Sequence, residues 1–205
     1  ALRVATYDAE NRELRFAAKS PYGIGNPWDE DSQREFYALH VFEELDRPGE
    51  YYLDRQEQKL YLWPAGDLKE SSVVVSLCQK PLLTMSRTSH VVLRDLVFEN
   101  GCDRGVRMKN CSRGKIENCI VRNLGLGGIG CSGGSHNTIV GCEVTRTGSR
   151  AVWLKAGDRK SLTDGNCSVI GNHLHHVGRH DWGGGRGVTL RGCGNRVAHN
   201  LIHHC

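Results

Sequence analysis

Short runs of alternating hydrophobic and polar residues return at a fixed interval along the second half of the chain. The run at residues 93–98 (LRDLVF) returns at 116–121 (IENCIV), 139–144 (IVGCEV), 169–174 (VIGNHL) and 197–202 (VAHNLI), with spacings of 23, 23, 30 and 28 residues. A second run starts at residues 106, 129, 152 and 188, with spacings of 23, 23 and 36. The excess over 23 lies in two insertions, at residues 158–165 and 178–186.

These runs are short, alternate with period two, are bounded by Gly or Asn, and show no helical period. One such unit cannot bury its own apolar face, but stacked units pair their strands in parallel about 4.8 Å apart and share a continuous core. The pattern therefore predicts an all-β fold, a right-handed parallel β-helix with a coil of about 23 residues over residues 72–205.

Residues one coil apart should form columns. One predicted column reads Leu96, Cys119, Cys142, Asn172 and Asn200, and another places Cys131 between Met108 and Leu154. The chain has nine cysteines, an odd number, and no CxxC pair. We therefore expect mostly stacked free thiols that fill the core as small apolar side chains, and an asparagine ladder at Asn172 and Asn200.

Residues 1–71 precede the coils and read as an N-terminal cap. Residues 50–54 and 59–63 are aromatic-rich runs around a four-residue polar link, which predicts a β-hairpin. We also expect a short helix near residues 34–45 and a first coil strand at 72–77. Because the last coil stops at Cys205 without a polar capping segment, we expect the natural chain to continue beyond it.

Charge divides the chain at the same boundary. Residues 1–80 hold 10 Lys/Arg and 15 Asp/Glu, a net of −5, whereas residues 81–205 hold 17 and 8, a net of +9. No run approaches the 18 apolar residues of a membrane helix, so we expect no membrane partner. The basic half lacks a stacking-aromatic motif, and we expect no nucleic-acid partner either.

Residues 43–54 (EELDRPGEYYLD), followed by 60–64 (LYLWP), resemble the N-terminal segment of bacterial pectate-lyase-like β-helix proteins, among them glycoside hydrolases of the α-galactosidase and fucosidase/xylanase type. Residues 156–159 (AGDR) and 194–200 (GNRVAHN) are similar to later coil motifs of the same group. The resemblance covers residues 40–205. It implies a secreted or periplasmic carbohydrate-active protein whose catalytic acids lie on coils after Cys205.

Two outward columns beside the second strand suit a sugar. One reads Arg107, Gly130, Trp153 and Thr189, and the other reads Lys109, Ser132, Lys155 and Arg191. Aromatic faces stack on sugars and cations pair with acidic groups, so Trp153, Lys155, Lys109 and Arg191 are predicted substrate-binding residues. A solvated basic face explains the same pattern equally well.

The insertions hold the other candidates, because long loops on a rigid scaffold often carry function. Arg159 is a further predicted binding residue. Asp158 and Asp181 are the candidate carboxylate pair for glycoside hydrolysis, against the alternative of loop ion pairs.

Histidines also align between coils. His175 is expected beside His203, and His176 beside His204, which would suit a transition metal. With no carboxylate or thiolate clearly in register, a solvated turn is the preferred interpretation, and we expect no metal and no cofactor.

The leading functional hypothesis is the N-terminal part of a polysaccharide-degrading glycoside hydrolase, with a polysaccharide or oligosaccharide as partner. A polysaccharide lyase with calcium, using Lys155 or Arg191 as base, is the enzymatic alternative. A non-catalytic glycan-binding or structural β-solenoid is the other.

Overall fold

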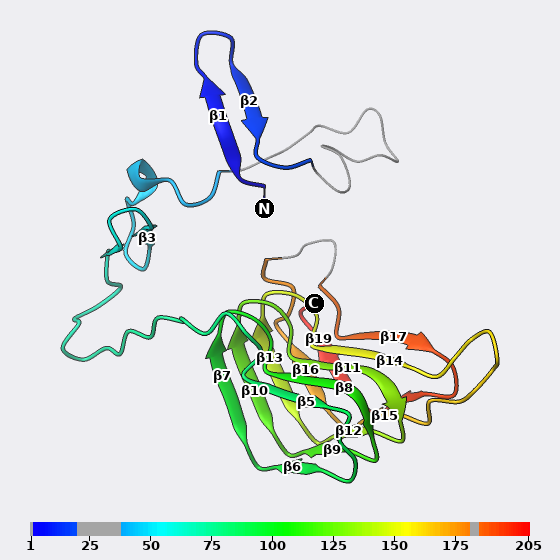
Figure 1. The fold of residues 1–205 in the computed structure, drawn as a ribbon. Coiled ribbons are helices and arrows are strands. Elements are labelled where there is room, and N and C mark those ends of the chain that lie inside the picture. The colour runs from blue at the N-terminus through cyan, green and yellow to red at the C-terminus, as the bar shows by residue number, and fades with distance from the viewer. Residues whose placement is uncertain (1, 20–37, 181–184) are drawn as a thin grey trace. The chain divides into compact units, whose positions relative to one another are not determined.

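The computed structural model describes residues 2–19, 38–180 and 185–205. The chain divides into two compact units, Ala1–Val73 and Val74–Cys205. Each unit is built from its own strands (Figure 1), and the second carries the repeats found in the sequence.

The described residues of the first unit form two antiparallel hairpins. The predicted hairpin is confirmed as β3 (Tyr51–Asp54) paired with β4 (Lys59–Leu62), and it is preceded by the 3-10 turn η1 (Phe42–Glu44). The other hairpin pairs β1 (Val4–Asp8) with β2 (Glu13–Phe16) and was not predicted. No α-helix lies in the described part of residues 34–45, so the helix expected there is absent from residues 38–45.

The two hairpins use the same turn chemistry. An aspartate ends the first strand, four residues follow, and the fourth of them, Arg12 or Gln58, has a left-handed φ of 54°. The Asp8 carboxylate accepts the backbone N–H of Asn11 at 3.0 Å, and the Asp54 carboxylate accepts two backbone N–H groups at 2.9 Å. Aspartate favours such turns because its short side chain caps nearby backbone donors.

The second unit is a stack of five coils, each with three strands, which form three five-stranded parallel sheets. The first sheet consists of β5 (Leu83–Ser86), β8 (Val106–Ser112), β11 (Ile129–Ser135), β14 (Val152–Ala156) and β17 (Val188–Gly192). The second consists of β6 (Val92–Arg94), β9 (Lys115–Glu117), β12 (Thr138–Val140), β15 (Ser168–Ile170) and β18 (Arg196–Ala198). The third consists of β7 (Val97–Gly101), β10 (Ile120–Leu124), β13 (Glu143–Thr147), β16 (His173–His175) and β19 (Leu201–His203).

The register matches the sequence repeat and confirms the predicted fold. Leu93, Ile116, Ile139, Val169 and Val197 are successive partners in the second sheet. The middle three are at most 1% exposed, whereas Val197, on the last coil, is 38% exposed. Apolar burial therefore peaks in the interior coils, as stacking of mutually covering units requires.

The interior columns hold the thiols and the amide ladder that the sequence predicted. All nine cysteines are free, and five of them are buried: Cys111, Cys119, Cys131, Cys142 and Cys167. Asn172 is 2% exposed; its amide nitrogen lies 2.9 Å from Oδ1 of Asn200, and its Oδ1 accepts the N–H of Cys142 at 2.9 Å.

Left-handed residues end the strands of the third sheet. Asn100, Asn123, Arg146, His176 and His204 occupy equivalent positions one coil apart, with φ between 50° and 61°. Asparagine and histidine are enriched in this conformation, because it is strained for most other residues. This repeated turn fixes the histidines at the ends of β16 and β19.

One sequence prediction about the first coil is wrong. Residues 72–77 form no strand in the described chain, and the first coil strand is β5 instead. The apolar side chains of this segment are exposed, because no neighbouring coil pairs with its backbone. Its contacts to the coils include Cys102, whose thiol donates to the carbonyl of Ser76 at 3.1 Å.

Candidate functional site

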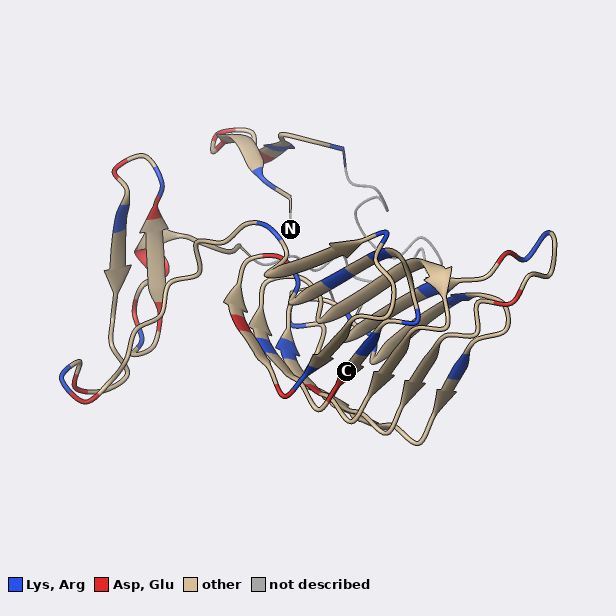
Figure 2. Cartoon of the chain, turned by 60° about the horizontal axis from the view of Figure 1, so that its bottom comes forward, with Lys and Arg blue, Asp and Glu red and all other residues tan. Residues whose placement is uncertain are grey.

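The outward face of the first sheet carries the predicted basic column. Lys109 is the partner of Ser132, Ser132 of Lys155, and Lys155 of Arg191, so the four side chains leave the same face of adjacent strands. Lys109, Lys155 and Arg191 are exposed. With about 4.8 Å between strands, a ligand crossing the sheet would meet cations roughly 10 Å and then 5 Å apart. Figure 2 shows Lys and Arg positions recurring on the strands of the solenoid.

Trp153 stands in the adjacent outward column, half-buried between two small neighbours. Its register partners are Gly130 and Thr189. Gly130 has no side chain, but the Arg104 guanidinium covers the space beside it: Nη1 lies 3.1 Å from where a Cβ of Gly130 would stand. Arg104 is anchored by Asp103 at 3.3 Å, so the face carries a further, partly shielded cation.

Asp158 lies near the start of the loop between β14 and β15, and its carboxylate accepts hydrogen bonds from residues of the same turn. Its Oδ1 accepts the backbone N–H of Lys160 at 3.0 Å, and its Oδ2 accepts the hydroxyl of Ser161 at 2.8 Å. These hydrogen bonds, led by that from Lys160, lower the pKa of the Asp158 carboxyl. A general acid needs the opposite shift. Arg159 is exposed in the same loop, and Asp181 lies outside the described residues.

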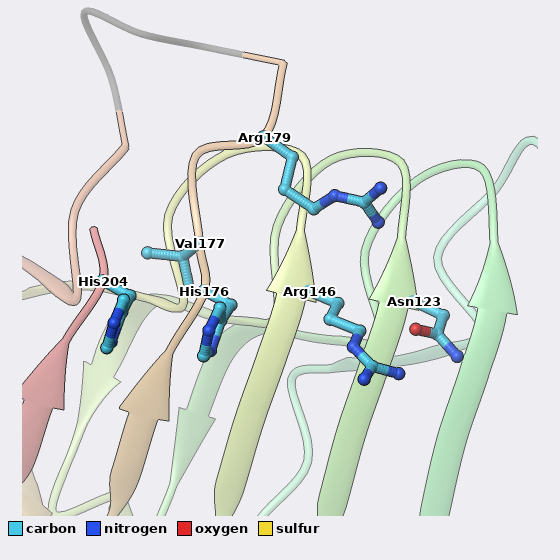
Figure 3. A pocket seen from close by; sticks show the side chains of 6 residues that line it. All are labelled: Asn123, Arg146, His176, Val177, Arg179 and His204. Carbon is cyan, nitrogen blue, oxygen red and sulfur yellow. The ribbon is translucent and has the colours of Figure 1, made fainter.

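A hollow of about 590 Å³ lies at the end of the third sheet, and the sequence analysis did not predict it. Figure 3 shows the imidazoles of His176 and His204 side by side, with Arg146 and Asn123 on the next strands and Arg179 above them. The two rings stack with centroids 4.6 Å apart and an angle of 5° between their planes. The lining residues are Asn123, Arg146, His176, Val177, Arg179 and His204.

Next to this hollow, three half-buried histidines converge on the outward face of the third sheet. His173 and His175 flank the buried Leu174 on β16, and His203 is the β19 partner of His175. One ring nitrogen from each histidine lies within 4.8 Å of the other two. Burial and the neighbouring histidine charges, His204 first among them, lower the pKa of His203.

The histidines do have a carboxylate in register, contrary to the sequence interpretation. Glu143 is the β13 partner of His173, and its Oε1 lies 3.1 Å from Nε2 of His175. The relevant column reads Ile120, Glu143, His173 and Leu201. The sequence spacing that aligns Glu143 with His173 identifies this carboxylate, which the columns of His175 and His176 do not contain.

A family model described as a right-handed β-helix region matches residues 81–205, and the chain belongs to this family. Membership agrees with the stacked parallel sheets and points to a carbohydrate-active or structural β-solenoid. Comparison with curated proteins and with solved structures gave no match. Among the described residues, no helix has the length and apolar character needed to cross a membrane.

Proposed function

We propose that this protein is a carbohydrate-active β-helix protein that binds an acidic polysaccharide across the outward face of its first sheet. The observation that carries the proposal is the alignment of Lys109, Lys155 and Arg191 in one column beside Trp153. A secreted or periplasmic location belongs to the proposal.

Each part of this face matches a part of such a ligand. The half-exposed indole of Trp153 offers a ring for stacking against a pyranose, between the small residue Thr189 on one side and Gly130, covered by Arg104, on the other. The exposed cations pair with carboxylates or sulfates through charge-assisted hydrogen bonds. Backbone ladders flank β8, β11 and β14 on both sides and β17 on one side, so the backbone positions of the column are fixed before the ligand binds.

We propose glycoside hydrolysis as the reaction. Asp158 is engaged in its turn and has a lowered pKa, so we assign the catalytic acids to other positions. A polysaccharide lyase remains the second candidate, favoured by the adjacent Lys155 and Arg191, since a lyase uses a basic residue to abstract the proton next to a uronate carboxylate.

Titration with polygalacturonate and with a neutral glucan tests the proposal. The variant Lys155→Ala/Arg191→Ala should fold as the wild type, because exposed charges contribute only about 0–1 kcal/mol each to stability. Its affinity for polygalacturonate should fall at least about tenfold, which is about 1.4 kcal/mol. The control Lys80→Ala/Arg196→Ala removes the same charge from exposed positions outside this column.

The two double variants distinguish binding at a specific site from attraction by the net positive charge of the protein. Loss of affinity in the first variant and retention in the control support a binding site on this face, and Trp153→Ala should then weaken binding as well. Equal affinities in all three proteins would show that the column is a solvated face. Formation of an unsaturated product from polygalacturonate would favour the lyase.

A further inference from the structure

We propose that His173, His175 and His203 bind a divalent transition-metal ion, with Glu143 beside them, and that this ion links the last two coils. The inference does not depend on the proposed glycan face, which belongs to a different sheet. It rests on geometry that the fold imposes on these four side chains.

The backbone brings the three imidazoles together. Alternation along β16 sends His173 and His175 outward while Leu174 is fully buried, so the two rings lie on one face with centroids 4.1 Å apart. Parallel pairing places His203 directly beside His175, with ring centroids 5.1 Å apart. Two coils therefore supply three nitrogen ligands, and the ladder hydrogen bonds fix the strands that carry them.

The nitrogen spacing suits a metal of the zinc, copper or nickel class. Nε2 of His173 and Nε2 of His203 are 2.8 Å apart. Metal–nitrogen bonds of about 2.0–2.1 Å at an angle near 90° separate two ligand nitrogens by about 2.9 Å, and a tetrahedral angle separates them by about 3.3 Å. Small ring rotations reach either geometry. Without an ion, the Nε2–H of one imidazole must donate a hydrogen bond to Nε2 of the other, because two lone pairs at this distance repel each other.

Glu143 supplies the negative charge that a cation site needs. Its Oε1 is 3.1 Å from Nε2 of His175, where it can orient the ring by accepting an N–H or provide an oxygen ligand. Thr145 Oγ1 also contacts Nδ1 of His175, at 3.2 Å. Imidazole with one carboxylate is a donor set that favours first-row transition ions over calcium or magnesium, which take oxygen ligands.

The bound ion would cross-link β16 and β19. Leu201 and Ile202 on β19 are 59% and 43% exposed, so apolar packing holds this last strand only weakly. A ligand that binds only the folded arrangement stabilises it by mass action. We therefore expect metal to slow backbone hydrogen exchange in residues 201–203 more than in the interior coils.

The test uses the full chain, freed of metal by chelation and titrated with Zn²⁺ and with Co²⁺. We expect one equivalent to bind, with visible d–d absorption of Co²⁺ that reports nitrogen ligation. The variants His173→Gln and His203→Gln should lose this binding, and Glu143→Gln should weaken it about 10–100-fold. His136→Asn is the matched control: it removes an exposed histidine from a left-handed turn that asparagine also tolerates.

Hydrogen exchange and circular dichroism show whether each variant is folded, so that loss of metal binding can be distinguished from loss of structure. A folded His173→Gln protein without Co²⁺ absorption, beside a control that binds normally, supports the site. Absence of stoichiometric binding in the wild type, or equal binding in wild type and His203→Gln, would overturn the proposal. Zn²⁺ binding that depends on His204 but not on His173 or Glu143 would overturn it too.

Discussion

Replacing Asn172 by Ala should remove about 3 kcal/mol from the free energy of unfolding of the β-helix unit. The Asn172 amide accepts the N–H of Cys142 at 2.9 Å and donates to the carbonyl of Ile139 at 3.1 Å, both inside the coil stack. Alanine removes both hydrogen bonds and leaves the buried N–H of Cys142 without this acceptor, and the loss of each buried hydrogen bond costs about 1–3 kcal/mol. Small domains have a total stability of about 5–15 kcal/mol, so the loss would be large.

Neighbouring coils provide a matched variant. Cysteine occupies the equivalent position in the two preceding coils, and the Cys142 thiol donates weakly to the carbonyls of Ile116 and Val140. Asn172→Cys should therefore retain part of the donation but lose the acceptor for the Cys142 N–H, giving roughly half the loss of Asn172→Ala. Urea unfolding followed by Trp fluorescence and by circular dichroism measures both. A loss below about 1 kcal/mol for Asn172→Ala would refute the ladder as a stabilising element.

Two further predictions concern the packing of the coils. Burial raises the pKa of the Cys142 thiol to about 11, so alkylation of the native protein at neutral pH, read by mass spectrometry, should spare it and label the exposed cysteines first. Those exposed cysteines are Cys78, Cys102 and Cys205. Gly128→Ala should destabilise the coils by about 1–3 kcal/mol, because the new Cβ would lie 2.4 Å from the Ala151 carbonyl oxygen. Gly66→Ala, where a Cβ meets nothing within 4 Å, is the control, and equal thermal melts of the two variants would contradict this packing.

The coil register could be derived from sequence because each coil repeats one pattern of inward apolar residues. Parallel stacking places residues 23 positions apart side by side. The pairing of Ile116 with Ile139 can therefore be predicted from the repeat length alone, without knowledge of side-chain geometry. The insertions lengthened two coils without shifting the strands, and Val169 therefore still pairs with Ile139.

Features that lack a repeated partner escaped the sequence analysis. The segment at residues 72–77 is as apolar as a coil strand, but apolarity alone does not provide a ladder to pair with. The hairpin from β1 to β2 was missed although its turn, Asp8 to Glu13, matches the pattern from Asp54 to Lys59. Comparing those two turns would have predicted it.

For the candidate site, the sequence predicted which residues share a column but not which side chains are in contact. Spacing placed Lys155 beside Arg191, and the structure confirms that register. The position of Arg104 over Gly130 depends on a long side chain from a different turn, which no repeat reveals. The column that joins Glu143 to His173 can be read from the sequence, but the contact of Glu143 with His175, two residues further along β16, depends on side-chain geometry.

The salt dependence of polygalacturonate binding tests the proposed glycan face most directly. If ion pairing with the basic column drives binding, the logarithm of the affinity should fall linearly with the logarithm of salt concentration, as it does for other polyanions. Lys155→Ala/Arg191→Ala should reduce that slope by about 2, one for each cation lost, while Lys80→Ala/Arg196→Ala keeps the wild-type slope. An identical slope in all three proteins would contradict the account, because the column would then release no counterions when the polysaccharide binds.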